Sequence, residues 1–217
     1  METSRFEIDM DRTHFTSDTH FGHARIADLA GRPEPDVDTM NAQMVRDFNQ
    51  TVGPSDTTWH AGDWCMGKIN VSLPIAGQLN GRKQSTPGNH DRTDPENPKP
   101  GGGLDRAGWE ARYQEVAGIE TVQGPIELVL DGTVFVFCHY PYEGDSQAVD
   151  RFADRAPEFH GLPMIHGHVH EQWRVRMYRG VPMVNVGVDA WAGRPVSAHV
   201  VLAAARAGVD AVPLEWA

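Results

Sequence analysis

Apolar and polar residues alternate over short stretches in the first half of the chain, and segments with helical spacing separate these stretches. Side chains two positions apart lie on one face of a strand, so the alternation predicts short, half-buried strands. Between Met40 and Val52 apolar residues recur every four positions, which predicts an amphipathic helix with Asp36 and Asp38 as capping candidates. The predicted elements of this half are strands over 6–10, 13–17 and 57–61 and helices over 23–29, 40–52 and 69–79.

The second half of the chain is rich in hairpin signals. Two arms of β-branched and aromatic residues at 126–130 and 133–138 flank Asp131-Gly132, a dipeptide typical of hairpin turns. A second hairpin is predicted over 173–178 and 181–188. The remaining predicted elements are a helix over 145–155 and strands over 162–166, 195–203 and 208–214. Strands that alternate with helices early and pair as hairpins late indicate two packed β-sheets with helices outside.

Side chains that can bind metal or carry protons gather where predicted strands end. In Gly88-Asn89-His90-Asp91 an amide, an imidazole and a carboxylate follow a short strand in a tight turn that Gly88 permits. Four other strand ends carry similar groups, in the order Asp18-Thr19-His20, Gly62-Asp63, His139 and Gly167-His168-Val169-His170. Seven ligand-type residues on five strand ends are what a dinuclear metal site requires. Their carboxylate, imidazole and amide groups suit Mn, Fe, Zn, Co or Ni, and the lack of clustered thiolates argues against a structural zinc.

The order of these motifs, together with Ser17-Asp18-Thr19-His20-Phe21-Gly22-His23 and His139-Tyr140-Pro141, resembles the calcineurin-like metallophosphoesterase superfamily. The resemblance covers most of the chain and is greatest to small bacterial and bacteriophage members. It implies an α/β fold, a four-layer αββα sandwich of two mixed β-sheets flanked by helices, with the site at the edge of the sheets. It also implies a hydrolase of phosphoester bonds that uses two divalent ions, with Mn²⁺ as the first expectation.

The resemblance further implies a role for each motif residue. The implied ligands are Asp18, His20 and His170 for one ion, Asn89, His139 and His168 for the other, and Asp63 as the bridge. His90 would protonate the leaving oxygen, and Asp91 would orient His90. His23 and Arg92 are candidates for substrate contacts, although His23 fits a polar residue in the first turn of a helix equally well. Residues 92–103 hold three prolines and three glycines, which predicts a loop beside the site, either a lid or a passive insertion.

Two departures from the pattern of the protein Ser/Thr phosphatase branch bear on the substrate. Gly62-Asp63-Trp64-Cys65-Met66-Gly67 lacks the arginine of G-D-x-x-D-R-G, and Asp91 stands where that branch has glutamate. A phosphomonoester carries nearly two charges, and within the motif segments only Arg25 and Arg92 could offset the second one. We therefore expect small phosphodiesters, including 2′,3′-cyclic nucleotides. The alternatives are a phosphomonoesterase acting on nucleotides and a metal-binding scaffold without catalysis, and the intact His90 favours an enzyme.

Composition restricts the partners. The chain has 217 residues, enough for one domain over 1–217, and its 19 Lys+Arg against 30 Asp+Glu give a net charge of −11. Without a block of basic residues this charge repels a nucleic-acid backbone, so we expect a small phosphoester substrate and neither a nuclease nor a stable nucleic-acid partner. No stretch of about 18 apolar residues predicts a membrane span, which favours a cytoplasmic protein. The sequence predicts no particular oligomeric state.

Four further residues beside the motifs, two cysteines and two histidines, are given structural interpretations. Cys65 and Cys138 are expected to be buried, reduced thiols, because two cysteines do not make a disulfide framework. His60 lies next to the Gly62-Asp63 motif and points to the opposite face of its strand from Ala61, which favours a structural role. His166, two positions before His168, is interpreted as a buried neighbour of the site.

Overall fold

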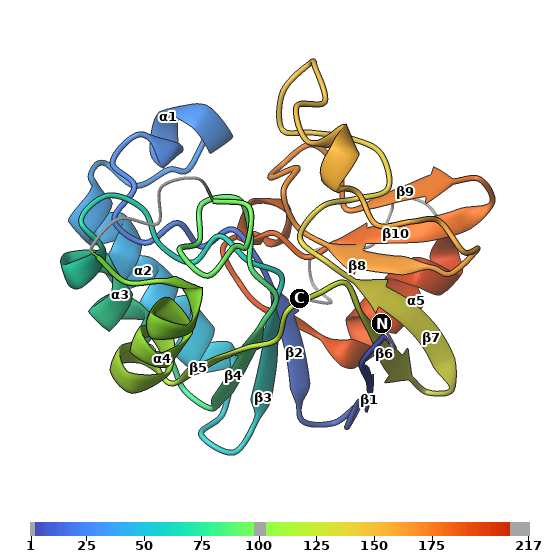
Figure 1. Cartoon of the computed structure of the whole chain (residues 1–217), viewed down its shortest axis with the longest axis horizontal. Helices are drawn as coiled ribbons and strands as arrows, with labels where there is room; N and C mark the ends of the chain where they lie inside the picture. The colour runs from blue at the N-terminus through green and yellow to red at the C-terminus, as the bar shows by residue number, and fades with distance from the viewer. Residues whose placement is uncertain (1–2, 98–102, 209–217) are drawn as a thin grey trace.

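Two mixed β-sheets pack face to face in the computed structural model, which describes residues 3–97 and 103–208 (Figure 1). One sheet has five strands in the order β11-β2-β3-β4-β5, and the other has six in the order β1-β6-β7-β8-β10-β9. Helices α1–α4 lie on the outer side of the five-stranded sheet (Figure 1). The predicted α/β class with two mixed sheets flanked by helices is therefore confirmed. None of the described helices combines the length and apolar character needed to cross a membrane.

The described residues form strands and helices with the following bounds. The strands are β1 (Arg5–Glu7), β2 (Thr13–Thr16), β3 (Thr57–His60), β4 (Arg82–Ser85), β5 (Ile119–Thr121), β6 (Ile126–Leu130), β7 (Thr133–Phe137), β8 (Met164–His166), β9 (Val175–Tyr178), β10 (Val181–Asn185) and β11 (Val196–Ser197). The helices are α1 (Ile26–Ala30), α2 (Val37–Thr51), α3 (Ile69–Ala76), α4 (Arg106–Ala117) and α5 (Ala198–Ala207), with 3₁₀ turns η1 (Ala153–Arg155) and η2 (Val188–Trp191).

The parallel pairing of strands brings the motif segments to one edge. Strands β2, β3 and β4 run parallel, with Thr16 opposite His60 and His60 opposite Ser85 at their last positions. In the other sheet β7 and β8 are also parallel, with Phe137 opposite Ile165. Parallel strands end at the same edge of a sheet, so the loops that follow these five strands lie together.

Three apolar clusters hold the layers together. The first lies between the sheets, where Phe15 and Trp59 of one sheet and Phe137 of the other belong to one cluster with buried residues of α5. The second joins α1–α4 to the outer face of the five-stranded sheet through residues such as Met40 and Phe48. The third covers the outer face of the six-stranded sheet with side chains such as Tyr142, Phe152 and Phe159. That outer face is therefore covered by an irregular segment with one 3₁₀ turn.

Local signals explain the helix ends that were predicted. The Asp36 side chain accepts a hydrogen bond from the backbone N–H of Thr39 and caps α2. Gly31 ends α1 in the left-handed conformation that glycine adopts without penalty. Helix α3 forms with Pro74 inside it.

Two predictions of secondary structure need correction. The helix predicted over 145–155 is irregular apart from η1, and the strand predicted over 195–203 is the short β11 followed by α5. Ser197 explains the second difference, because its side chain accepts the N–H of Val200 and starts a helix. Elements α4 and β5 were not predicted. The strand predicted over 208–214 falls outside the described residues except for Gly208, which ends α5.

Candidate metal centre

All seven predicted ligand residues lie in loops that leave the carboxyl ends of β2, β3, β4, β7 and β8. Eight described residues other than glycine have a left-handed backbone, and five of them are predicted ligands: Asp18, His20, Asp63, His168 and His170. Such conformations are unfavourable for residues with a side chain, and they concentrate at functional sites. Hydrogen bonds hold these loops beyond the strand ends, because the Asp18 and His20 N–H groups donate to the carbonyls of Gly62 and Asp63 at 3.0 Å.

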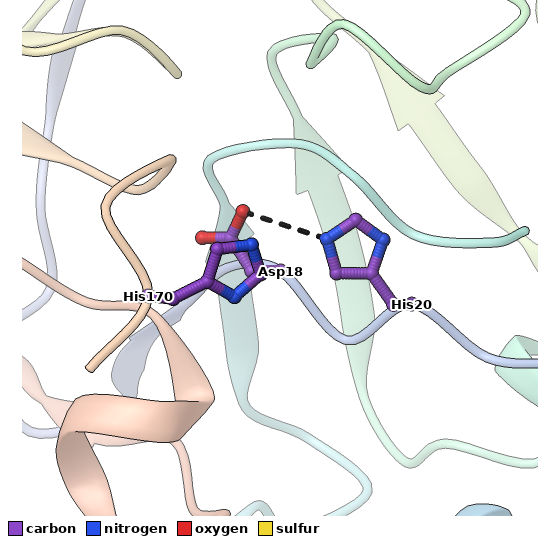
Figure 2. Close-up of side chains that lie close together, drawn as sticks. All are labelled: Asp18, His20 and His170. Atoms are coloured by element: carbon purple, nitrogen blue, oxygen red, sulfur yellow. Dashed lines mark ion pairs between the residues drawn. The ribbon is translucent and has the colours of Figure 1, made fainter. Parts of the chain in front are cut away.

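The first group of ligand atoms belongs to Asp18, His20 and His170, whose polar atoms all lie within 4.8 Å of one another. In Figure 2 the Asp18 carboxylate and the His20 imidazole point toward each other, with 3.9 Å between Oδ1 and Nε2. Both atoms are buried and have no hydrogen-bond partner among the described residues. A buried polar atom without a partner is costly, and a cation would satisfy both. Burial also raises the pKa of the Asp18 carboxyl, an effect that a bound cation would oppose.

The second group surrounds the Asp63 carboxylate. Its Oδ2 lies 3.6 Å from His139 Nε2 and 3.7 Å from His20 Nε2, so it reaches a histidine of each predicted ion position. His139 Nε2 in turn lies 3.2 Å from both Asn89 Oδ1 and His168 Nδ1. Burial alone would raise the pKa of Asp63, but the neighbouring histidines, His139 first, hold it below its usual range. The structure thus places Asp63 between the two predicted positions.

Two of the histidines are held by a hydrogen bond at the ring nitrogen that faces away from the centre. His139 Nδ1 lies 2.7 Å from the carbonyl oxygen of Ala61, and His170 Nδ1 lies 2.7 Å from Asp189 Oδ2. His168 Nε2 lies 3.6 Å from Asp145 Oδ2, which is too far for a hydrogen bond, and it has no hydrogen-bond partner among the described residues. Outer hydrogen bonds such as those of His139 and His170 fix the orientation of a ligating imidazole and leave its other nitrogen free for a metal.

The pKa values of His168 and His170 shift in opposite directions, because the two rings have different electrostatic surroundings. Burial lowers the pKa of His168 to about 3, so its ring is neutral and its lone pair is available near pH 7. Burial also acts to lower the pKa of His170, but the hydrogen bond to Asp189 and the charge of Asp18 outweigh it and raise that pKa to about 9. The pocket around His170 therefore attracts positive charge strongly.

Arg32 and Asp189 support the first group, and the sequence analysis missed both. The Arg32 guanidinium pairs with Asp189 at 2.7 Å and donates to the backbone carbonyls of Asp18 and Thr19 at 2.7 and 2.9 Å. It therefore joins the loop that carries Asp18 to the carboxylate that orients His170. Neither residue belongs to a sequence motif, since Arg32 follows a helix and Asp189 lies in the 3₁₀ turn η2. Asp145, which contacts His168, was missed in the same way.

The predicted structural interpretations of the two buried histidines are confirmed. The His60 ring stacks on Trp64 at 3.6 Å, accepts the Gly62 N–H at Nδ1, and lies 3.3 Å from the Thr19 hydroxyl at Nε2. His60 thus ties the Asp18 loop to the Asp63 loop. His166 is buried, and its Nδ1 lies 2.7 Å from the Gly167 carbonyl oxygen. Cys65 and Cys138 are buried free thiols, as predicted.

Asp91 occupies a different position from the one its predicted role requires. Both of its oxygens accept hydrogen bonds from backbone N–H groups, those of Gly88, Asp63 and Trp64, at 2.8–3.1 Å. The Tyr113 hydroxyl is a further neighbour at 3.5 Å. The carboxylate is fully buried and is engaged with these backbone groups, so it holds the Asp63 and Asn89 loops together and does not orient the His90 ring. This corrects the role implied by the resemblance.

The remaining candidates lie at the rim of the site. His90 is exposed, its ring lies 5.4 Å from that of His20, and its backbone N–H donates to Asp63 Oδ1 at 2.8 Å. His23 is half-buried, 5.6 Å from His20 between ring centroids, in the turn before α1. Arg92 stacks on the ring of Trp109. The described part of the 92–103 loop, 92–97 and 103, has no regular structure, as predicted.

Motif glycines allow the loops to approach closely. A Cβ atom on Gly62 would overlap the backbone of Gly88, and one on Gly88 would overlap Asp63 Oδ1. A Cβ on Gly167 would overlap the Ser17 hydroxyl and lie 2.5 Å from Asp18 Oδ2. The side chains of the candidate centre converge because these positions carry no side chain of their own.

Gly167→Ala is expected to lower the free energy of unfolding by about 1–3 kcal/mol, because neither Ser17 nor Asp18 can move away without disturbing the loops. Gly108→Ala in α4 is the control. There the nearest atom is 3.2 Å from the new Cβ, and alanine favours a helix, so a change within about 1 kcal/mol is expected. Urea unfolding monitored by circular dichroism measures both. Equal effects of the two substitutions would contradict this account of the loop packing.

The donor set fits divalent cations. Two groups of buried carboxylate and imidazole atoms could hold a metal ion, namely Asp18 with His20 and His170, and Asp18 with Asp63 and His139. Several of these atoms have no other partner among the described residues, and the outer Nδ1 atoms of His139 and His170 are already engaged. Oxygen and imidazole donors together suit first-row transition metals.

Comparisons with known proteins identify relatives along most of the chain. The gene 66 protein of Mycobacterium phage L5 is 31% identical over 192 residues, which cover 87% of this chain and 91% of that protein. The gene 66 protein of Mycobacterium phage D29 is 32% identical over 188 residues, 84% of this chain and 90% of that protein. No model of a protein family matches the chain.

Among solved structures, a protein of unknown function from Aquifex aeolicus, AQ665, matches with a TM-score of 0.62 and 22% identity. The match covers 88% of this chain and 97% of that one, and it supports the fold. An archaeal phosphodiesterase matches with a TM-score of 0.43 and 18% identity over 81% of this chain and 82% of that one, a likeness too low to inform function. By its sequence relatives, the chain belongs to the family of the mycobacteriophage gene 66 proteins.

Proposed function

We propose that the protein is a metal-dependent phosphoesterase that hydrolyses small phosphodiesters at a site for two divalent ions. The observation that carries this proposal is the convergence of Asp18, His20, Asp63 and His139. Oxygen and nitrogen atoms of these buried side chains lie 3.9 Å apart for Asp18 and His20, 3.7 Å for His20 and Asp63, and 3.6 Å for Asp63 and His139. Unpartnered ligand atoms, left-handed backbone at five ligand positions and closely packed motif glycines support it together. The motif resemblance to metallophosphoesterases points to the same chemistry.

The proposed division of ligands keeps the assignment made from the sequence. Asp18, His20 and His170 would hold one ion, Asn89, His139 and His168 the other, and Asp63 both, with Mn²⁺ as the first expectation. When bound, two such ions supply a lowered pKa for a water molecule and stabilise the charge on the phosphoryl oxygens. The pKa of Asp63 is held below its usual range and its Oδ2 lies within 3.7 Å of a histidine of each group, so it would link the two positions.

His90 is proposed as the group that gives a proton to the leaving oxygen. Its side chain is exposed at the rim, and its backbone N–H is held by Asp63 Oδ1, so the ring stands beside the first predicted ion position. Asp91 contributes indirectly, because it fixes the turn that carries His90. His23, whose ring also lies beside His20, is proposed as a substrate contact.

Diesters are expected to be preferred over monoesters. A diester carries one negative charge and a monoester nearly two at neutral pH, so the monoester needs an additional fixed cation. Arg32, the arginine in direct contact with the ligand loops, is already paired with Asp189 and cannot serve this purpose. The net charge of −11 further disfavours long polyanions such as nucleic acids.

The test compares bis(4-nitrophenyl) phosphate, 4-nitrophenyl phosphate and 2′,3′-cyclic AMP as substrates of the Mn²⁺-loaded protein. We expect kcat/KM for at least one diester to exceed that for the monoester by about tenfold or more, and no hydrolysis after chelation and removal of the metal. A monoester value tenfold above both diesters would contradict the preference. Hydrolysis of none of the three with Mn²⁺, Fe²⁺, Zn²⁺, Co²⁺ or Ni²⁺ would reject the proposed function.

A further inference from the structure

A small hollow lies beside His90, on the side of the site that faces α3 and α4. It has a volume of about 130 Å³ and is lined by Cys65, Met66, Gly67, Ile69, His90, Arg92 and Asn97. One water molecule occupies about 30 Å³ of the liquid, so the hollow has room for about four waters. Pockets for drug-sized ligands begin near about 300 Å³. The hollow therefore fits one small chemical group and is too small for a nucleoside.

Arg92 is the cation of this hollow, and its position is fixed on two sides. Its guanidinium lies 4.7 Å from the ring centroid of Trp109, a side chain that is 3% exposed. Its backbone N–H points to the Tyr113 hydroxyl at 3.4 Å. The residue before it, Asp91, is held by three backbone N–H groups. A guanidinium stacked on an aromatic ring keeps its N–H edges available for an anion.

No carboxylate of the described residues pairs with those edges. Within residues 3–97 and 103–208 Arg92 forms no ion pair. Arg32 and Arg155 differ in this respect, because Arg32 pairs with Asp189 and Arg155 pairs with Asp94. In a chain with net charge −11, a half-buried arginine without an acidic partner beside the proposed proton donor suits an anion from outside.

We infer that the hollow binds an anionic group, a carboxylate or a phosphate, on the leaving fragment of the substrate. The inference rests on the proposed function, because it takes His90 as the neighbour of the leaving oxygen. In the reaction a water oxygen forms a bond to phosphorus and the bond from phosphorus to the leaving oxygen breaks. The proton of His90 passes to that oxygen, and the anionic group at Arg92 leaves unchanged with the fragment. The substrate class is thus a phosphodiester whose leaving fragment bears a second anion.

The test uses two matched diesters, methyl 4-nitrophenyl phosphate and its analogue with a carboxylate on the ring next to the nitro group. Both leaving groups are nitrophenolates, so the comparison depends little on protonation by His90. We expect kcat/KM of the wild-type protein to be about tenfold higher for the carboxylate ester. Arg92→Gln should reduce this preference to less than twofold, and Arg92→Lys should keep part of it. A third ester with a phosphonate at the same ring position distinguishes a site for carboxylate from one for phosphate.

Arg25→Gln is the matched control, because Arg25 is an exposed arginine just before α1 and does not line the hollow. It should keep the full preference. Equal rates for both esters in the wild type, or an unchanged preference in Arg92→Gln, would overturn the inference while leaving the proposed function intact. If neither ester is hydrolysed, the proposed function fails. Calorimetry with 5-hydroxy-2-nitrobenzoate and with 4-nitrophenol then tests the anion site separately. The inference is overturned if the carboxylate compound does not bind, or if wild type and Arg92→Gln bind it equally well.

Discussion

Asp63→Ala is expected to empty both proposed ion positions, lowering bound metal from two ions per chain to less than one. The reason is geometric, since Asp63 Oδ2 lies between His20 Nε2 at 3.7 Å and His139 Nε2 at 3.6 Å. Asn89→Ala should weaken one position only, because Asn89 Oδ1 contacts His139 and no histidine of the first group. Elemental analysis after dialysis against limiting metal measures both. Asp28→Ala, which removes an exposed carboxylate of α1, is the control and should retain two ions.

A second variant separates the charge of Asp63 from its structural contact. Asp63 Oδ1 accepts the backbone N–H of His90 at 2.8 Å, and Asp63→Asn can keep that hydrogen bond while it removes the negative charge. We expect Asp63→Asn to lose metal nearly as Asp63→Ala does, but to unfold at a temperature closer to that of the wild type. Retention of two ions by Asp63→Ala would show that another carboxylate, such as Asp18, spans the two positions.

The position of the candidate centre at one edge of the sheets could be predicted, because the local pattern of apolar and polar residues shows where each strand ends. The alternation before Asp18 and before Asp63 defines where β2 and β3 stop, and parallel strands stop at one edge. The Asp-Gly turn defines the hairpin that delivers His139 in the same way. Each of these signals lies within about ten residues of the side chain it positions, which is why sequence alone suffices.

The supporting residues could not be predicted because their partners lie far away in the chain. Arg32 and Asp189 are 157 positions apart in the sequence. Asp145 belongs to the irregular segment that covers the outer face of the six-stranded sheet, and there it lies 3.6 Å from His168. Nothing in the residues around Arg32 distinguishes it from an exposed arginine. The role first given to Asp91 failed for a related reason. Its neighbour in sequence is His90, but its carboxylate accepts backbone N–H groups from its own turn, at Gly88, and from the Asp63 loop.

Side chains that compete with the backbone explain the helix wrongly predicted over 145–155. Asp145 accepts hydrogen bonds from the N–H groups of Gln147 and Arg151, and its carboxylate also pairs with the Arg151 guanidinium at 2.7 Å. An aspartate engaged in this way offers the backbone an alternative to helical hydrogen bonds. In the resulting irregular segment Asp145 Oδ2 lies 3.6 Å from His168 Nε2. A regular helix over these residues would not by itself bring the two side chains together.

His90→Ala is expected to lower kcat by about 10²–10⁴-fold on diesters with an alkoxide leaving group, the usual worth of a positioned general acid. On bis(4-nitrophenyl) phosphate the loss should be less than tenfold, because nitrophenolate leaves without a proton. Bound metal should stay at the wild-type level, since the His90 ring is exposed and its contact with Asp63 runs through the backbone N–H.

The matched control for His90 is His199→Ala, which removes an exposed histidine paired with Asp11 at the far end of the chain. It should leave the rates on both substrates unchanged. An equal loss on both substrates in His90→Ala, with two ions still bound, would remove the proton-donor role and make His90 a substrate-binding residue. A loss of metal would instead place its ring among the ligands. Asp63 contacts His90 through the backbone N–H and not through the ring. Both Asp63→Asn and His90→Ala should therefore lower activity, but only Asp63→Asn should lose metal.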